Sequence, residues 1–272
     1  IFMLIFPYAN ACFVSSDIEI KFDDSIPPVP LGEKVATEVN ITFSWGFGAF
    51  LPLPLTIYLE VESPSWAIVT LSKDSVQLNP MGLFGGEESK NVELKILARE
   101  ETEAFIEYPL TIRAYTDGNF LINGAENEKS TYIMQDFYDR GIEVEFPSSI
   151  SLIKGESRTV YLNITNNCNA PLTIEIEKEN VSGFSFIYDE TVNVPSHSTK
   201  SFRVTITAEE ISRTYGWLNI TYYSPEKGEK GYVEVPVYLI SASEGVGGGS
   251  AISIAIIIII IAIIIYAVWK KR

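Results

Sequence analysis

The sequence contains little of the residue types on which enzymes and disulfide-stabilised proteins depend. Its 272 residues include two cysteines and one histidine, His197. A histidine-based catalytic triad or a multi-histidine metal centre needs that side chain among several converging partners. His197 and Cys168 both lie in turn-like segments, and no G-x-S-x-G motif is present. We therefore expect a non-catalytic protein without a cofactor, stabilised by its cores and not by disulfides.

Basic residues are also scarce. Lysine and arginine number 20 against 35 aspartates and glutamates, which gives a net charge of −15. Such acidity disfavours nucleic acid and anionic lipid as partners, since both would be repelled.

A long apolar run occurs only near the C-terminus. Residues 251–269 carry no charge, and about 18 helical residues cross the ~30 Å core of a bilayer. Trp269 is followed by Lys270, Lys271 and Arg272, which is typical of a stop-transfer anchor with a cytoplasmic basic tail, 270–272. The sequence predicts a single-pass, type I cell-membrane protein whose bulk lies outside the cytoplasm.

The N-terminal residues 1–16 resemble the remnant of a signal peptide. An apolar stretch precedes Ala9-Asn10-Ala11, a cleavage-type motif. Cleavage there would expose Cys12, so lipidation of Cys12 is a minor alternative.

A tandem repeat organises the region between the two ends. Asp17–Phe22 resembles Gly141–Phe146, and Gly32-Glu33 resembles Gly155-Glu156. The same order continues in matches between Val39–Thr42 and Leu162–Thr165, and between Pro54–Ile57 and Pro171–Ile174. Four matches in order indicate two copies of one domain.

Within each copy, apolar and polar residues alternate with a period of two, and turn residues separate the runs. About seven short strands per copy predict an all-β fold of two tandem Ig-like β-sandwiches plus one C-terminal transmembrane helix. We place the first sandwich at residues 17–140 and the second at 141–240. A Gly/Ser-rich stalk at 241–250 then leads to the membrane.

The copies resemble the Ig-like repeats of the CARDB and NPCBM-associated type, which are common in archaeal and bacterial surface proteins. The resemblance implies an Ig-like fold and a surface location, but its motifs mark strands and turns and not chemistry. The second copy also lacks the Trp of the Pro-x-Trp motif. The motifs are Gly32-Glu33, Val39–Thr42, Pro64-Ser65-Trp66, Val76–Pro80 and Val92–Ile96 in the first copy, and Gly155-Glu156, Asn163–Asn167, Val192–Pro195 and Phe202–Ile206 in the second.

Several polar motifs are candidate modification or binding sites. We expect glycosylation of at least one of the four N-x-S/T sequons, which lie at outward strand positions or in a turn. Carboxylates at alternate strand positions, such as Glu60 and Glu62 or Glu175 and Glu177, are predicted to form solvated sheet faces. An aspartate and two asparagines near 120 supply oxygen ligands of the kind calcium prefers, although ordinary turn chemistry explains them as well. The sequons are Asn40, Asn163, Asn180 and Asn219, and the weak cation candidates are Asp117, Asn119 and Asn123.

Two Gly-rich loops of the first copy carry Trp45, Phe47, Phe50 and Phe84, and the second copy has no equivalent. Glycines free the backbone to present these rings, so we predict that they contact a protein or glycan partner, or the membrane. The sequence thus favours a spacer and interaction module in adhesion, envelope organisation or membrane-complex assembly. The alternative is an accessory subunit that presents substrate to, or stabilises, an envelope enzyme or transporter.

Overall fold

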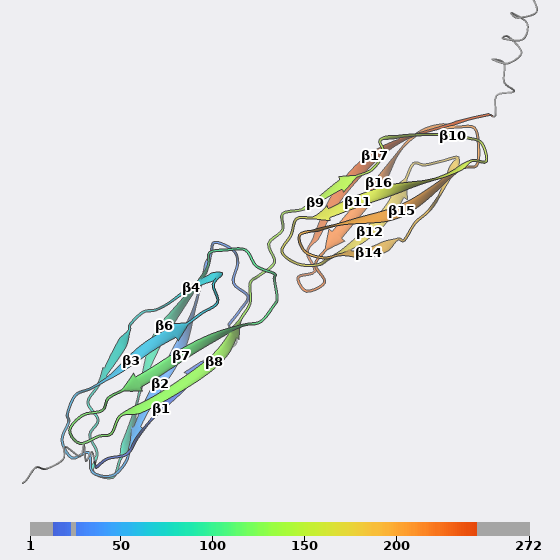
Figure 1. The fold of residues 1–272 in the computed structure, drawn as a ribbon. Helices are drawn as coiled ribbons and strands as arrows, with labels where there is room; N and C mark the ends of the chain where they lie inside the picture. Colours follow the sequence, from blue (N-terminus) through green and yellow to red (C-terminus); the bar gives the residue numbers. More distant parts are fainter. Residues whose placement is uncertain (1–12, 23–25, 244–272) are drawn as a thin grey trace, which may run out of the picture. The chain divides into compact units, whose positions relative to one another are not determined.

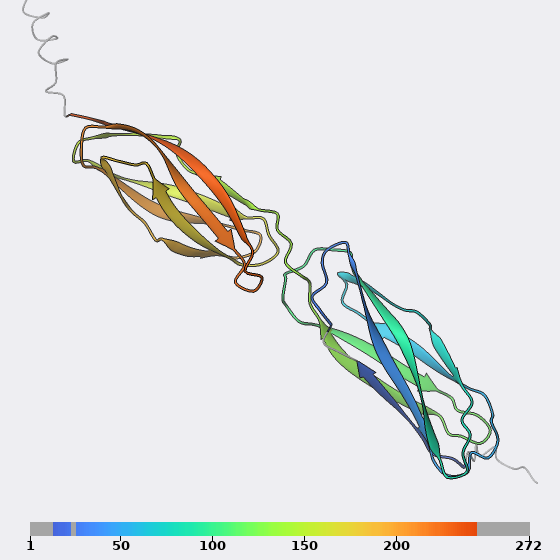
Figure 2. The ribbon, with the colours of Figure 1, turned by 180° about the vertical axis from the view of Figure 1, so that it is seen from behind.

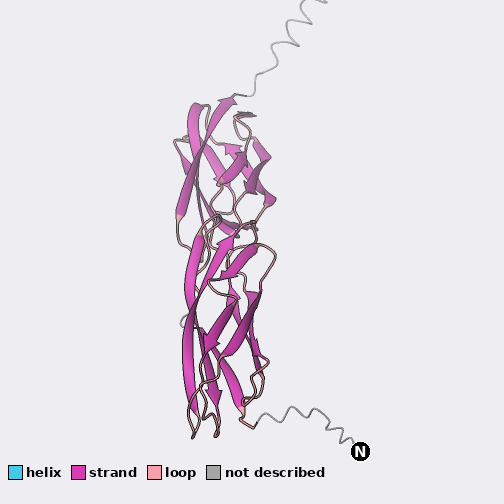
Figure 3. Ribbon diagram, turned by 90° about the vertical axis from the view of Figure 1, so that its left-hand side faces the viewer, coloured by secondary structure: helices cyan, strands magenta, loops and turns pink. Residues whose placement is uncertain are grey.

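The computed structural model describes residues 13–22 and 26–243, and every regular element in this part of the chain is a β-strand (Figure 3). The chain divides into two compact units. Among the described residues, unit 1 comprises 13–22 and 26–140 together with Cys168–Ala170, and unit 2 comprises 141–167 and 171–243. The predicted signal remnant up to Cys12, the end of the stalk, the membrane helix 251–269 and the basic tail lie outside the described residues. No helix within the described residues is long and apolar enough to cross a bilayer.

Unit 1 is a sandwich of two antiparallel four-stranded sheets, ordered β1-β2-β6-β4 and β5-β3-β7-β8 (Figure 1). The predicted β-sandwich is therefore confirmed for this copy. Its strands are β1 Ser16–Phe22, β2 Lys34–Trp45, β3 Leu55–Glu62, β4 Ala67–Leu71, β5 Ser75–Leu78, β6 Gly86–Ala98, β7 Tyr108–Thr116 and β8 Ala125–Ile133.

Unit 2 is a second sandwich, with a four-stranded sheet β13-β15-β11-β9 and a five-stranded sheet β10-β17-β16-β12-β14. Figure 2 shows β16 and β17 side by side in orange, and they pair along their whole length from Arg213↔Ile240 to Tyr223↔Lys230. The pairing of β10 with β17 is parallel. The strands are β9 Ile142–Glu145, β10 Ser149–Ile153, β11 Ser157–Asn166, β12 Leu172–Glu179, β13 Phe184–Ile187, β14 Thr191–Val194, β15 Ser198–Ala208, β16 Arg213–Tyr223 and β17 Lys230–Ala242.

The period-two pattern of the sequence explains which side chains enter the cores. In β2, Val39, Ile41 and Phe43 are fully or almost fully buried, whereas Asn40 and Thr42 point outward. Burying aliphatic and aromatic side chains in this way supplies ~1.5–3 kcal/mol each, which drives the two sheets together.

Candidate functional site

The loops at one end of unit 1 gather large exposed apolar side chains, and we call this surface the apolar tip. The loops follow β2, β5 and β7, and they meet where the described chain begins (Figure 1). Phe84 is 88% exposed, Phe120 81% and Phe47 68%. The members of the apolar tip are Phe13, Phe47, Phe50, Leu51, Met81, Leu83, Phe84 and Phe120.

Backbone hydrogen bonds hold the loops of the apolar tip together. The Gly48 N–H donates to the Leu83 carbonyl at 3.0 Å, and the Phe13 N–H donates to the Leu121 carbonyl at 3.1 Å. The rings of Phe47 and Phe84, which come from different loops, lie 6.1 Å apart. Since the loops are tied to one another, the exposed rings form one surface.

The structure separates the four aromatic residues expected at this position. Phe47, Phe50 and Phe84 are exposed, but Trp45 is only 9% exposed and belongs to the core, so the expectation of an exposed Trp45 is corrected. The reason lies in the glycines. A Cβ atom at Gly86 would lie 2.7 Å from Trp45 Cζ2, so this glycine makes room for the indole ring, which also stacks on Phe43 at 6.2 Å.

Sequence reasoning missed five of the eight members of the apolar tip, among them Leu51, which follows the predicted Phe50. Met81 and Leu83 stand beside the predicted Phe84, while Phe13 and Phe120 come from more distant segments. Their signal was an apolar residue inside a turn-rich segment, but only the fold shows that these segments share one end of the sandwich.

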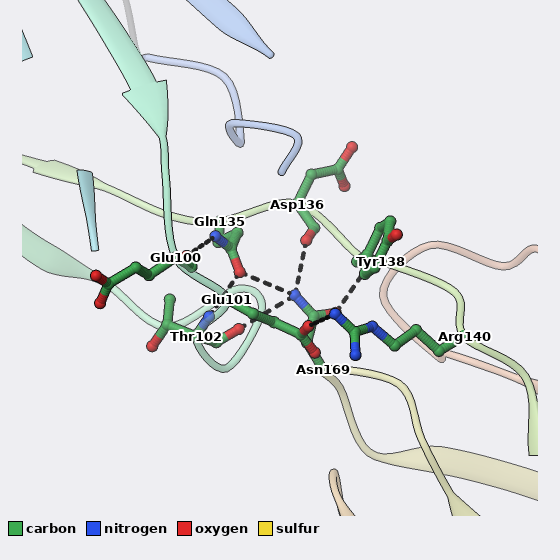
Figure 4. Close-up of polar contacts among 8 residues, drawn as sticks. All are labelled: Glu100, Glu101, Thr102, Gln135, Asp136, Tyr138, Arg140 and Asn169. Carbon is green, nitrogen blue, oxygen red and sulfur yellow. Dashed lines mark hydrogen bonds and ion pairs between the residues drawn. The ribbon is translucent and has the colours of Figure 1, made fainter. Parts of the chain in front are cut away.

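A second cluster, buried and polar, lies elsewhere in unit 1 (Figure 4). Asn169, from the short segment Cys168–Ala170, is fully buried, as is Gln135. The Asn169 Nδ2 donates to the Thr102 carbonyl at 3.1 Å, to the Asp136 carbonyl at 3.1 Å and to Gln135 Oε1 at 3.2 Å. Its Oδ1 accepts from the Tyr138 N–H at 2.8 Å.

Gln135 extends this cluster. Its Nε2 donates to the Glu100 carbonyl at 2.9 Å, and its Oε1 accepts from the Thr102 N–H at 2.8 Å. Beside it, Arg140 forms an ion pair with Glu101 at 2.7 Å. Most partners are backbone groups, so the cluster satisfies loop hydrogen bonds and fixes Cys168–Ala170 within unit 1. The predicted division assigned all of residues 141–240 to the second sandwich, whereas Cys168–Ala170 belongs to unit 1.

Asn119, one of the three predicted cation candidates, has structural partners. Asn119 Oδ1 accepts backbone N–H bonds from Leu121 at 2.9 Å and Ile122 at 3.0 Å. Its Nδ2 donates to the Leu53 carbonyl at 3.4 Å, so Asn119 braces the loop that also contains Asp117 and Asn123. Within residues 13–22 and 26–243, no three His, Cys, Asp or Glu side chains converge as a metal site.

The sequons differ in their surroundings. Asn40 Nδ2 donates to Asn91 at 2.6 Å, Asn163 Nδ2 to Glu145 at 3.3 Å and Asn219 Nδ2 to Glu179 at 3.1 Å, all on strand faces. Asn180 lies in an exposed turn with a φ of 54°. Glycosylation stays a prediction, and Asn180 has the most open position of the four.

Comparison with known proteins assigns no family to the chain. No protein-family model and no curated protein matches it. Among solved structures, the PapD-like domain 7 of human CEP192 is 11% identical and covers 38% of this chain and 85% of its own, with a TM-score of 0.32. Domains 4 and 5 of the S-layer protein SbsC are 10% identical, with 83% and 98% covered and a TM-score of 0.28. The E. coli chaperone DraB is likewise 10% identical, with 80% and 98% covered and a TM-score of 0.28.

Proposed function

We propose that this chain is a non-catalytic, membrane-anchored cell-surface module that binds a partner protein through the apolar tip. The observation that carries the proposal is the concentration of eight large apolar side chains on one end of unit 1. Exposed apolar patches of this kind often mark interaction sites, because leaving them in water is unfavourable.

The charge of the tip loops supports an apolar protein surface as the partner. Residues 46–54, 79–85 and 117–124 contain one charged residue, Asp117, and no lysine or arginine. An anionic bilayer would find no cation to attract it here. A partner that offers an apolar groove would bury the rings of Phe47 and Phe84 without separating charges.

The experiment compares two double variants of the full chain in affinity capture from solubilised membranes. Phe47→Ser with Phe84→Ser removes two anchors of the apolar tip, and truncated anchors typically cost ~2 kcal/mol or more each. We expect capture of the partner to fall at least tenfold while the melting temperature changes little. Ile187→Ser with Ile211→Ser, two exposed apolar residues of unit 2, is the matched control. Equal losses of capture in both double variants would contradict the proposal. Unchanged capture by the Phe47→Ser, Phe84→Ser variant together with a lower melting temperature would contradict it as well.

The anchoring part of the proposal rests on residues 251–269 and the three cations after them. Protease added to intact cells should remove the sandwiches and leave a C-terminal tag protected. A tag that is shaved from intact cells would refute the type I orientation. The identity of the captured partner also separates the two roles, because an envelope enzyme or transporter would favour the accessory-subunit alternative.

A further inference from the structure

Strand β16 of unit 2 carries a sequon whose asparagine follows a tryptophan on the same face of the sheet. Trp217, Asn219 and Thr221 occupy alternate positions of the strand and are partly exposed, while Leu218 and Ile220 between them are buried. Side chains two residues apart in a strand project from one face, with their Cα atoms roughly 7 Å apart. A group attached to Asn219 would therefore lie beside the indole ring of Trp217.

The side-chain amide of Asn219 leans toward Trp217. Its Nδ2 donates to Glu179 Oε2 at 3.1 Å. Glu179 is the residue of β12 that is paired with Trp217, whereas Asn219 itself is paired with Glu177. Since Nδ2 is the atom that carries the sugar in an N-linked glycan, the first sugar would start on the Trp217 side of Asn219.

The other two sequons on strands are held differently. Asn163 is bonded at both ends of its amide, because Nδ2 donates to Glu145 at 3.3 Å and Oδ1 accepts from the Ser201 hydroxyl at 2.7 Å. The amide of Asn40 is also bonded at both ends. The Oδ1 of Asn219, by contrast, is buried and has no hydrogen-bond partner among the described residues. Hydrogen bonding within the sheet therefore accounts for the other two asparagines, but only in part for Asn219.

Trp217 belongs to a row of apolar side chains that we call the aromatic strip. Its ring packs edge to face with that of Tyr215, with centroids 5.2 Å apart and planes at 87°. On the neighbouring strand β17, Pro236 is paired with Trp217, and the exposed Tyr238 is paired with Tyr215. Tyr215 covers one side of Trp217 along the strand, and Asn219 lies on the other side. The C–H face of a sugar can pack on such a ring and remove apolar carbon from water.

The tryptophan and the sequon are both absent from the matching strand of unit 1. Strand β7 has Pro-Leu-Thr-Ile at 109–112, in the same alternation as Trp-Leu-Asn-Ile at 217–220 of β16. The sandwich therefore forms without either residue. Their joint presence in unit 2 is what a shared role predicts.

We propose that Asn219 carries an N-linked glycan whose first sugar packs on Trp217 and covers the aromatic strip. In the linking step, Nδ2 bonds to the anomeric carbon of an oligosaccharide carried on a lipid phosphate. The bond from that carbon to the phosphate oxygen breaks, the lipid phosphate leaves with the electron pair, and Nδ2 releases one proton. Nδ2 keeps a second N–H, which can still donate to Glu179 and hold the amide in the direction of Trp217.

The surrounding charges favour a neutral sugar, such as a hexose or an N-acetylhexosamine. Asn219 is paired with Glu177 on one side and with Glu234 on the other. Carboxylates accept hydrogen bonds from sugar hydroxyls, whereas an acidic sugar would be repelled. The inference rests on the extracytoplasmic location in the proposed function, because N-glycans are found on secreted chains, but it does not depend on the apolar tip.

The first test is peptide mass spectrometry of the chain purified from its native host. The expected result is a neutral glycan at Asn219. An unmodified Asn219 would overturn the inference, even if another sequon carries a glycan. Protease protection of the C-terminal tag decides the location separately, so the two failures can be told apart.

The second test measures the contact with Trp217. The full chain is made in a host that modifies N-x-S/T sequons and in one that does not, and both forms are melted in detergent micelles. Glycosylation should raise the melting temperature of unit 2, and Trp217→Ala should remove about 3 °C or more of that rise. Thr221→Ala, which abolishes the sequon, should remove the same part, and the two losses should not add.

The control is Tyr132→Ala, which removes an exposed ring from β8 of unit 1, where no sequon lies. It should leave the rise unchanged, and an equal loss in Trp217→Ala and Tyr132→Ala would overturn the inference.

Acrylamide quenching of fluorescence decides the matter without a variant, should Trp217→Ala not fold. Trp45 and Trp66 are buried, so among the described residues the quenching reports chiefly on Trp217. Trp269 is the same in both preparations. The glycosylated chain should be quenched less than the unglycosylated chain, and equal quenching would refute the packing of the sugar on Trp217.

Discussion

Replacing Asn169 by leucine should destabilise unit 1 far more than an ordinary Asn→Leu change. Leucine has the same branched arrangement of heavy atoms as asparagine but is bulkier, and it cannot donate or accept a hydrogen bond. The substitution removes the bond to the Tyr138 N–H and those to the carbonyls of Thr102 and Asp136, all at a fully buried position. It also removes the bond to the side chain of Gln135.

The magnitude follows from the number of buried groups left without this partner. A buried donor or acceptor that loses its hydrogen bond costs ~1–3 kcal/mol. The Asn169 amide has two N–H hydrogens for three acceptors, so its losses are not fully additive, and we expect about 3–6 kcal/mol in total. Since domains of this size are stable by ~5–15 kcal/mol, the melting temperature of unit 1 should fall by about 10 °C or more.

The control is Asn91→Leu on the outer face of β6. Asn91 also makes two side-chain hydrogen bonds, with Asn40 and Glu38, but in an exposed position where water replaces them. We expect it to cost less than about 1 kcal/mol. Calorimetry of the full chain should distinguish the two variants. A loss of unfolding free energy in Asn169→Leu no greater than that in Asn91→Leu would refute the conclusion that this buried cluster stabilises unit 1.

Three further predictions concern the core, the surface charges and the sequons. Phe43→Ala should lower the free energy of unfolding, measured by chemical denaturation, by ~3–5 kcal/mol, because Phe43 is fully buried. Arg113, chiefly by its hydrogen bond, lowers the pKa of Glu126 below its ordinary 4.5. The contribution of the ionised Glu126 to the stability of the fold is therefore present above pH 4.5 and is lost as the pH falls through the pKa of the folded state. An NMR titration should show the pKa of Glu126 rising in Arg113→Ala. Mass spectrometry of protein from the native host should show a glycan at Asn180 that Ser182→Ala removes.

The sequence predicted the all-β fold well because its signals are local. Alternation in β2 and β6 fixes which residues face the core, and the repeat of Pro-Leu-Thr-Ile predicts two related sandwiches. The predicted sandwiches are present in the structure, whereas the membrane helix lies outside the described residues.

The parts that sequence reasoning missed depend on contacts between distant residues. Trp45 is buried because Gly86 leaves space for its ring, and the two residues are paired across strands, 41 positions apart in the sequence. Asn169 meets Gln135 from a separate segment, and no local pattern marks either residue as a partner of the other. Side-chain shape and non-local pairing decide both cases.

Site-specific photo-crosslinking tests the central claim, that the apolar tip is the surface that meets a partner. A benzophenone amino acid replaces Phe84 in one version of the full chain and the exposed Ile187 of unit 2 in another. After irradiation of intact native cells, the account predicts a discrete crosslinked protein at position 84 and none at position 187. Crosslinks of equal yield at both positions, or at position 187 alone, would contradict it.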